Sequence, residues 1–193
     1  MIILTDKKLL AKGGERYCYI NPLDKSKIIK VLNPMIKQHN NQNELEYKYY
    51  SFLYSRNDLN LINIAKCYGW IETNLGKGLV FDRILDYDGK DAKHFRYYLR
   101  NKLLTKDLEN KLLDELKTFL EVNLILFVDV STVNLFCQRI NEQDFRLVIF
   151  DGLGARRDGM KLNLYMKSKL LTKYKINKQW KKFLKNYRRD KLN

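Results

Sequence analysis

The sequence contains few of the residues from which metal centres and disulfide frameworks are built. It has three cysteines (Cys18, Cys67 and Cys137), no Cys-x-x-Cys pair, and only two histidines (His39 and His94). Structural zinc sites and disulfide scaffolds need closely spaced ligands or paired cysteines, so we expect neither. The odd number of cysteines favours a reduced, cytoplasmic setting, in which they serve as small buried hydrophobic residues.

Long apolar segments, proline and glycine are also scarce. The longest uncharged apolar run is Val122 to Val128, far below the roughly 18–20 residues that a membrane helix needs. Charge appears at Asp6 and Lys7, too early for a secretory signal. With 2 Pro and 9 Gly, repeat and linker-rich architectures are excluded. We therefore expect one domain over residues 1–193 without a transmembrane segment.

Positive charge dominates the residues that are present. The 37 Lys and Arg exceed the 22 Asp and Glu, which gives a formal charge of +15, while 45% hydrophobic residues suffice for a core. Such a charge indicates an anionic partner: a nucleotide, a nucleic acid, an acidic substrate or a membrane surface. A general abundance of lysine without any function would produce the same excess.

Hydrophobic periodicity divides the chain into a β-rich part and a mostly helical part. Strands are expected at 2–4 with 9–10, 17–20, 27–32, 65–72, 78–82, 135–140 and 145–150. Helices are expected at 41–55, 94–104, 106–123 and over the segment after 154. The fold class is therefore α+β, with a small antiparallel N-lobe (1–83) containing one helix and a reduced, mostly helical C-lobe (84–193) that ends in a basic helix.

Three early features suit phosphate chemistry. Gly13 and Gly14 stand between two strands, where glycine lets backbone N–H groups approach phosphates, although a plain hairpin uses the same pair. Lys30 lies inside an apolar strand, where it needs an anion or an exposed face. Glu46, on the next helix, could pair with Lys30; Glu44 is the rival, and a solvated helix charge is the other alternative.

A fourth feature supplies oxygen ligands. Asp129 and Asn134 are five residues apart, after a buried helix and before a strand, and Asp151 follows the next hairpin. Two carboxylates and one amide suit Mg²⁺ and the nucleotide phosphates that it bridges. The order of a glycine loop, strand lysine, helix glutamate, Asp-x-x-x-x-Asn and Asp-Gly is that of a protein kinase.

The sequence also resembles the YrbL family of PhoP regulatory network proteins, whose members have a protein-kinase-like fold. The resemblance spans roughly residues 1–154 and implies a two-lobe kinase-like fold for this chain. It rests on these segments: Gly14-Glu15-Arg16-Tyr17-Cys18-Tyr19, Ile29-Lys30-Val31, Glu46-Tyr47-Lys48-Tyr49-Tyr50, Cys67-Tyr68-Gly69, Glu72-Thr73, Asp86-Tyr87-Asp88-Gly89-Lys90, Asn134-Leu135-Phe136-Cys137 and Asp151.

Some motif positions depart from the kinase pattern. The usual His-Arg-Asp reads Phe127-Val128-Asp129, the position of the catalytic-loop lysine is Ser131, and the usual Asp-Phe-Gly reads Asp151-Gly152-Leu153. No Ala-Pro-Glu segment follows. These departures favour an alternative, a pseudokinase that acts as a nucleotide-binding regulatory or scaffold protein without turnover.

The main expectation is a phosphotransferase that uses ATP and Mg²⁺ and transfers the γ-phosphoryl group to a hydroxyl of an unidentified acceptor. The loop at Gly13 and Gly14 would cover the phosphates, and Lys30, held by Glu46, would contact the α- and β-phosphates. Adenine would hydrogen-bond to backbone groups at a hinge formed by Phe81, Asp82 and Arg83.

The later residues would carry the chemistry. Asp129 would orient the attacking hydroxyl and accept its proton, while Asn134 and Asp151 would hold Mg²⁺. The two groups of residues are expected to face one cleft.

The basic C-terminal segment allows a third interpretation. It mixes cations with aromatic residues, as nucleic-acid binding requires. However, Trp180, Phe183, Leu184 and Tyr187 recur at helical spacing, which favours a stripe packed on the helical lobe with the charges in solvent. The same segment could recruit an acidic substrate or touch anionic lipid.

Overall fold

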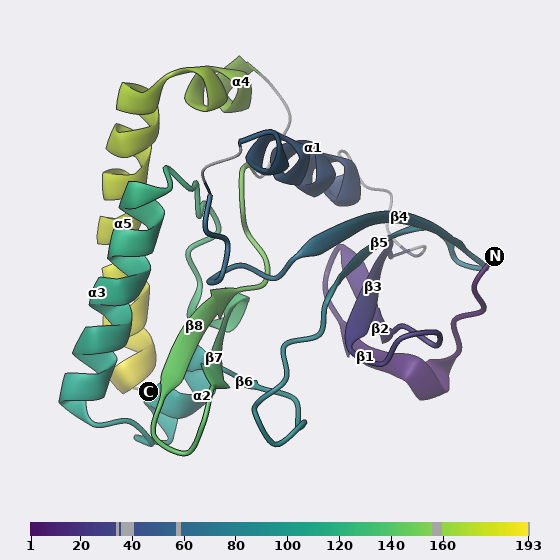
Figure 1. Ribbon diagram of the computed structural model, residues 1–193, viewed down its shortest axis with the longest axis horizontal. Helices are drawn as coiled ribbons and strands as arrows, with labels where there is room; N and C mark the ends of the chain where they lie inside the picture. The colour runs from purple at the N-terminus through teal and green to yellow at the C-terminus, as the bar shows by residue number, and fades with distance from the viewer. Residues whose placement is uncertain (34, 36–40, 57–58, 156–159, 193) are drawn as a thin grey trace. The chain divides into compact units, whose positions relative to one another are not determined.

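The computed structural model describes residues 1–33, 35, 41–56, 59–155 and 160–192. The chain forms two compact units (Figure 1). The first unit comprises Met1–Arg56 and Ala65–Arg83, and the second comprises Asn57–Ile64 and Ile84–Asn193. Each unit contains one antiparallel sheet and at least one helix, which confirms the expected α+β class.

The first unit is built on a five-stranded antiparallel sheet with the order β1-β2-β3-β5-β4. Its strands are β1 (Leu9–Lys12), β2 (Arg16–Ile20), β3 (Lys27–Leu32), β4 (Cys67–Thr73) and β5 (Gly76–Asp82). Helix α1 (Gln42–Tyr54) contacts β3, β4 and β5, and a 3₁₀ turn, η1 (Asp6–Lys8), precedes β1. The sequence therefore predicted this sheet and its helix with small errors at the ends.

Strand β3 is buried on both faces, which explains its continuous apolar sequence. On one face, Ile29 and Val31 join a hydrophobic cluster with Tyr19 and Val80. Because side chains alternate along a strand, Lys30 occupies the opposite face from Ile29 and Val31. The period of the strand thus places a lysine in the interior of the unit.

The prediction that residues 2–4 belong to the first strand is wrong, because β1 begins only at Leu9. Ile2 forms only an isolated parallel bridge with Thr73, and the Leu4 N–H donates to Asn74 Oδ1 at 2.7 Å. Ile2 and Leu4 are nevertheless buried, in the cluster that contains Ile29. Their hydrophobicity serves to cover the sheet rather than to extend it.

The second unit contains a three-stranded sheet and four helices among its described residues. The strands are β6 (Lys93–His94), β7 (Leu135–Arg139) and β8 (Phe145–Ile149), in that order. The helices are α2 (Phe95–Arg100), α3 (Lys106–Val122), α4 (Met160–Lys167) and α5 (Lys169–Leu192), and a 3₁₀ turn, η2 (Thr132–Asn134), precedes β7. Helix α5 packs against α2 and α3 (Figure 1).

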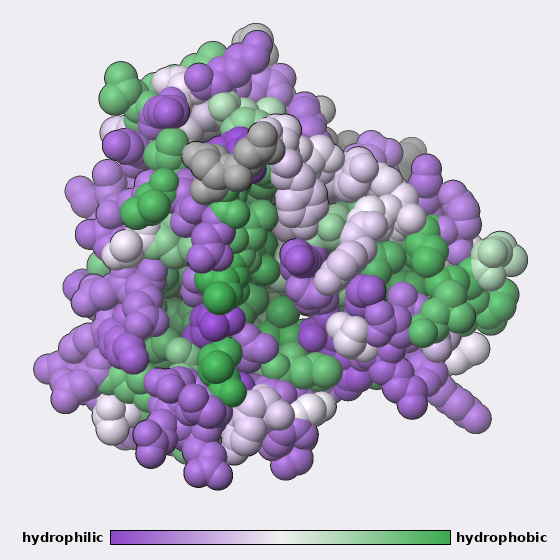
Figure 2. Space-filling model, viewed as in Figure 1, coloured by the Kyte–Doolittle hydropathy of each residue, from purple (hydrophilic) through white to green (hydrophobic). Residues whose placement is uncertain are grey.

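Helix α3 shows how sequence pattern determines packing in this unit. Its N-cap residue, Thr105, accepts a hydrogen bond from the Leu108 N–H at 3.2 Å. Leu112, Leu116 and Leu120 recur every four residues and are buried, as the periodicity predicted. The opposite face of α3 is exposed. Mainly hydrophilic residues, purple in Figure 2, cover the left side of the view, where Figure 1 places this helix.

Helix α2 is shorter than predicted. It ends at Arg100, and Lys102 takes a left-handed backbone conformation with φ 51°. His94 was expected on a surface helix, but it lies in β6 and its ring stacks on Phe136 at 4.5 Å. The residue is exposed, as expected, and desolvation of the imidazole lowers the pKa of His94.

Two of the three cysteines are buried, as the sequence predicted. Cys67 and Cys137 are buried, and burial raises the pKa of their thiols to about 11 and about 12. Cys18 is only half-buried, contrary to expectation. Among the helices that the structure describes, none has the length and apolar character to cross a membrane.

Candidate functional site

Lys30 and Glu46 form a buried ion pair within the first unit. Lys30 Nζ lies 3.2 Å from Glu46 Oε1 and 3.3 Å from Oε2, and it sits over the Phe81 ring at 4.2 Å from the centroid. Lys30 is 1% exposed and Glu46 is 5% exposed, whereas Glu44 is exposed. The pairing expected between Lys30 and Glu46 is therefore present. Two buried charges are tolerated only when they compensate each other.

The sequence did not single out two further members of this cluster. Arg16 Nη1 donates to the Glu46 carboxylate and, at 3.2 Å, to Asn43 Oδ1. Asn43 is fully buried and its Nδ2 donates to the Lys30 carbonyl at 2.9 Å. Glu46 is thus held between two cations. The spacing of Asn43 and Glu46, three residues apart on a buried helix face, was the available signal.

The glycine pair forms a tight turn between β1 and β2. The Gly13 N–H donates to the Arg16 carbonyl at 2.8 Å, and Asn33 Nδ2 donates to the Gly14 carbonyl at 3.3 Å. A Cβ on Gly13 would lie 2.9 Å from the Arg16 oxygen, whereas a Cβ on Gly14 would meet open space. This is the geometry of a plain hairpin, and a role in phosphate binding stays a prediction.

The predicted adenine contacts fall at the end of β5. Phe81 is fully buried beneath Lys30. The Asp82 N–H donates to the Lys66 carbonyl at 3.0 Å, and the Arg83 N–H donates to the Ser26 carbonyl at 2.9 Å. These two N–H groups are engaged within the first unit. An adenine contact through the carbonyl groups of these residues stays a prediction.

The second unit brings Asp129, Asn134 and Asp151 into two adjacent segments. The Gly152 carbonyl accepts the N–H groups of Val128 at 2.7 Å and Asp129 at 3.0 Å. Asn134 Nδ2 donates to the Asp129 carbonyl at 2.9 Å. This bond orients the amide so that its nitrogen faces the loop, and it leaves the oxygen as the ligand-type atom.

Gly152 makes the close approach of these segments possible. It has a φ of +86°, and a Cβ at this position would lie 2.7 Å from Asp129 Cβ and 3.2 Å from Asn134 Nδ2. The Gly152 N–H also donates to Asp151 Oδ1 at 2.8 Å. Only glycine combines this backbone conformation with this contact. Gly152 is therefore a structural requirement of this junction.

The donor set suits Mg²⁺ rather than a metal bound entirely by protein. Among the described residues, no group of three or more His, Cys, Asp or Glu side chains could hold a metal ion. Mg²⁺ is commonly bound by one or two carboxylates together with water and substrate phosphates. Asp151 and Asn134 supply hard oxygen ligands of that kind.

Helix α5 and Arg96 support the Asp129–Asn134 loop from within the second unit. Asn186 Nδ2 donates to the Val130 carbonyl at 2.6 Å. Asp190, 2% exposed, accepts hydrogen bonds from Thr132 Oγ1 and from Arg96 Nε, the latter at 3.0 Å. Sequence reasoning missed these supports. The signal was Asp190, the single acid in a long basic helix.

Ser131 belongs to the same network. Arg96 Nη2 donates to Ser131 Oγ at 3.3 Å. A guanidinium therefore contacts the position at which the kinase pattern has a lysine. This guanidinium comes from α2 and is also bound by Asp190.

The segment Asp86-Tyr87-Asp88-Gly89-Lys90 is a loop anchored on β7. Arg139 donates to Asp86 Oδ2 at 2.9 Å and to Asp88 Oδ2 at 2.7 Å. Desolvation opposes the ionisation of Asp88, but hydrogen bonds from Lys90 and Arg139 lower the pKa of this carboxyl to about 2. The two carboxylates of this segment thus fix the loop to β7 through Arg139.

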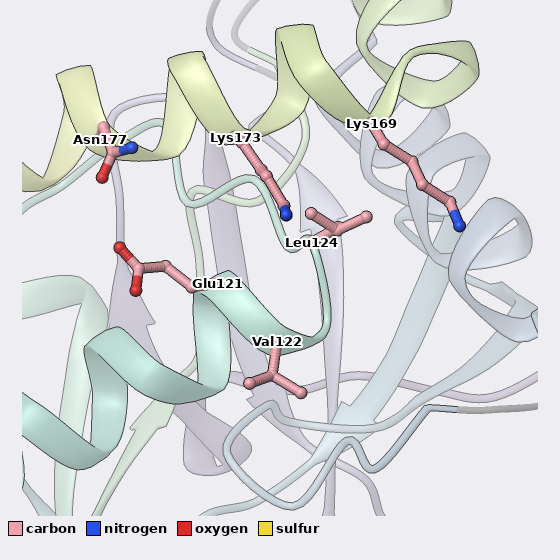
Figure 3. A pocket seen from close by; sticks show the side chains of 6 residues that line it. All are labelled: Glu121, Val122, Leu124, Lys169, Lys173 and Asn177. Atoms are coloured by element: carbon pink, nitrogen blue, oxygen red, sulfur yellow. The ribbon is translucent and has the colours of Figure 1, made fainter.

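A cavity of about 480 Å³ lies elsewhere in the second unit, between the end of α3 and the first half of α5 (Figure 3). Leu124, one of its lining residues, has a positive φ of 51°. None of the predicted site residues lines this cavity. Its lining residues are Glu121, Val122, Leu124, Lys169, Lys173 and Asn177.

Comparison with known proteins identifies the family. The protein described as uncharacterized protein YrbL in Escherichia coli (strain K12) is 29% identical over 186 residues, which cover 95% of this chain and 87% of that protein. The protein of the same description in Shigella flexneri matches to the same extent. The family model of PhoP regulatory network protein YrbL matches residues 2–188. The chain therefore belongs to the YrbL family of PhoP regulatory network proteins.

Proposed function

We propose that this protein is an Mg·ATP-dependent phosphotransferase with a protein-kinase-like two-lobe fold, which transfers the γ-phosphoryl group to a hydroxyl of its acceptor. The observation that carries the proposal is the junction at Gly152, where Asp129, Asn134 and Asp151 come from two segments joined by backbone hydrogen bonds. The buried Lys30–Glu46 pair supports it independently.

In this proposal Lys30 binds the α- and β-phosphates. Its ammonium is held by Glu46, Arg16 binds that carboxylate in turn, and Asn43 accepts a hydrogen bond from Arg16. A lysine constrained in this way is already oriented before the phosphates bind, so less conformational freedom is lost on binding.

Asn134 and Asp151 would hold Mg²⁺, which supplies charge neutralisation for the phosphates. Asp129 would orient the acceptor hydroxyl and take its proton. The Asp129 backbone is fixed by Gly152 and by the Asn134 side chain, which favours a defined position for its carboxylate. Most of the rate enhancement would come from positioning and charge neutralisation.

One observation favours the alternative, a pseudokinase that binds nucleotide without turnover. Phe127, at the usual histidine position, is 2% exposed and forms an isolated bridge with Leu153. Both residues occupy positions of kinase motifs, and here they serve the hydrophobic core. A scaffold needs such core residues, whereas phosphoryl transfer does not.

The full chain with Mg·ATP tests the proposal through phosphate release and self-phosphorylation. Asp129→Asn and Asp151→Asn are each expected to lower turnover by about 100-fold or more. Asp114→Asn, an exposed position on α3, is the control and should match the wild type. Binding of Mg·ATP without turnover in the wild type would support the pseudokinase alternative. Unchanged turnover in both variants would refute the assignment of the site.

A further inference from the structure

The positive charge of the chain is concentrated in helix α5. This helix contains ten Lys or Arg and one acid within 24 residues, a net charge of +9 out of +15 for all 193 residues. The other 169 residues carry 27 Lys or Arg and 21 acids, which is much closer to balance. A general abundance of lysine would spread along the chain and would not produce this concentration.

The cations form one exposed surface of the helix. Between residues 178 and 189, every exposed residue is a lysine or an arginine. We call these residues the cationic face of α5: Lys178, Lys181, Lys182, Lys185, Arg188 and Arg189. At about 1.5 Å per residue, the face is roughly 16 Å long. The opposite side of the helix is buried through Ile176, Phe183 and Asp190.

Within the described residues, acidic side chains neutralise little of the cationic face. The one acid of the helix, Asp190, is buried against Thr132 and Arg96, and of the six cations only Arg189 approaches it, at 3.8 Å. In the part of the chain that the structure describes, the other five take part in no ion pair. Burial first, and then the charges of Lys178, Lys161 and Lys182, lower the pKa of Lys175. Cations crowd together here, and an anionic partner would relieve their repulsion.

The chemistry of the face distinguishes among anionic partners. A helix that lies on a membrane needs an apolar side to bury in lipid, but Ile176 and Phe183 of α5 are buried inside the protein. The exposed large apolar residues of this helix, Leu170, Tyr174 and Leu192, lie outside the stretch 178–189. A protein interface needs apolar or aromatic anchors at its centre, and the cationic face has none. A nucleic acid requires only dense positive charge, because duplex DNA carries about one negative charge per 1.7 Å.

We therefore infer that the cationic face of α5 binds the phosphodiester backbone of a nucleic acid without reading its sequence. The binding is independent of the nucleotide site proposed above. It should weaken steeply with salt, because each phosphate contact releases counterions. The sequence favoured an apolar stripe of this segment packed on the helical lobe. That stripe and the cationic face lie on opposite sides of the same helix.

Fluorescence anisotropy with labelled oligonucleotides of random sequence tests the inference on the full chain. The triple variant Lys178→Glu, Lys182→Glu, Lys185→Glu should bind at least about tenfold more weakly at low salt. Its slope of log affinity against log salt should be smaller by about two to three. The control Lys7→Glu, Lys25→Glu, Lys106→Glu changes the net charge by the same amount at exposed positions and should bind nearly as the wild type. Circular dichroism and thermal melting check that both variants fold.

The remaining outcomes decide against the inference. An equal loss in both triple variants would show that net charge alone is responsible. The protein is also mixed with vesicles of one part phosphatidylserine to three parts phosphatidylcholine. If it binds them and oligonucleotides do not displace it, the cationic face belongs to a membrane contact. No binding by the wild type at low salt would also overturn it. Separate arms with duplex DNA, duplex RNA and single strands identify which backbone is preferred.

Discussion

Lys30 and Glu46 form an ion pair inside the first unit, with Nζ 3.2 Å from Oε1 and both side chains at most 5% exposed. Arg16 binds the same carboxylate, so the two partners are not equivalent. Glu46 is bound by both cations, Lys30 and Arg16. Removal of the acid affects two cations, whereas removal of the lysine leaves Arg16 on Glu46, so we expect the loss of the acid to have the larger effect.

Glu46→Gln should destabilise the protein by about 3–5 kcal/mol, because it removes a negative charge that two cations share, one of them the buried Lys30. Lys30→Met should cost less, because Arg16 still compensates Glu46. Urea denaturation followed by circular dichroism measures both free energies of unfolding. Glu44→Gln, exposed on the same helix, is the control and should change stability by no more than about 0.5 kcal/mol. A loss on Lys30→Met as large as that on Glu46→Gln would contradict this account.

Gly152→Ala should destabilise the second unit by more than the usual cost of placing alanine in a left-handed backbone conformation. The new Cβ would have to lie 2.7 Å from Asp129 Cβ, and φ is +86°. Gly89→Ala is the matched control, since Gly89 has a φ of +77° and open space around it. We expect about 1–2 kcal/mol for Gly89→Ala and about 1–3 kcal/mol more for Gly152→Ala. Equal losses in thermal or urea denaturation would show that the contact with Asp129 is unimportant.

Asp190→Asn should loosen the Asp129–Asn134 loop although residue 190 lies far away in the sequence. Asp190 accepts hydrogen bonds from Thr132 and Arg96, and bonds of this charged type contribute about 1.5–3 kcal/mol. Hydrogen exchange should show faster exchange at residues 131–134 than in the wild type. Asp114→Asn, at an exposed position on α3, should leave that exchange unchanged. Unaltered exchange in Asp190→Asn would remove α5 as a support of the loop.

Asp88 should give stability a dependence on acid pH. Its folded-state pKa of about 2 lies below the ordinary value of 3.8, so the carboxylate stabilises the fold at neutral pH. That contribution should be lost as the pH falls from about 4 to about 2. The difference in free energy of unfolding between wild type and Asp88→Asn should be constant above about pH 5 and shrink below pH 4. If the difference in free energy of unfolding instead grew as the pH fell, Asp88 would not be stabilised in its charged form, which would contradict this prediction.

Hydrophobic periodicity predicted most elements of the fold because those elements bury one regular face. Helix α3, with Leu112, Leu116 and Leu120 inside, and strand β3 are examples. It failed at Ile2 and Leu4, which are buried without forming a strand, and at His94, whose position depends on stacking with Phe136. Such contacts join residues far apart in the chain and leave no local pattern.

The candidate site was predicted to a similar degree. Spacing and residue type were enough to propose Lys30, Glu46, Asp129, Asn134 and Asp151. The supports Arg16, Asn43, Arg96 and Asp190 were missed because they act through tertiary hydrogen bonds. A buried polar residue on an otherwise apolar face, or a lone acid in a basic helix, is the sequence signal that such supports leave.

Calorimetric titration of the full chain with ATP and magnesium tests the central claim most directly. The wild type is expected to bind Mg·ATP, and Lys30→Met and Asp151→Asn should each weaken binding by about tenfold or more, although these residues belong to different units. Loss in both variants, with circular dichroism showing that they fold, would connect both groups of residues to one nucleotide. No binding by the wild type, or unchanged binding in both variants, would contradict the account.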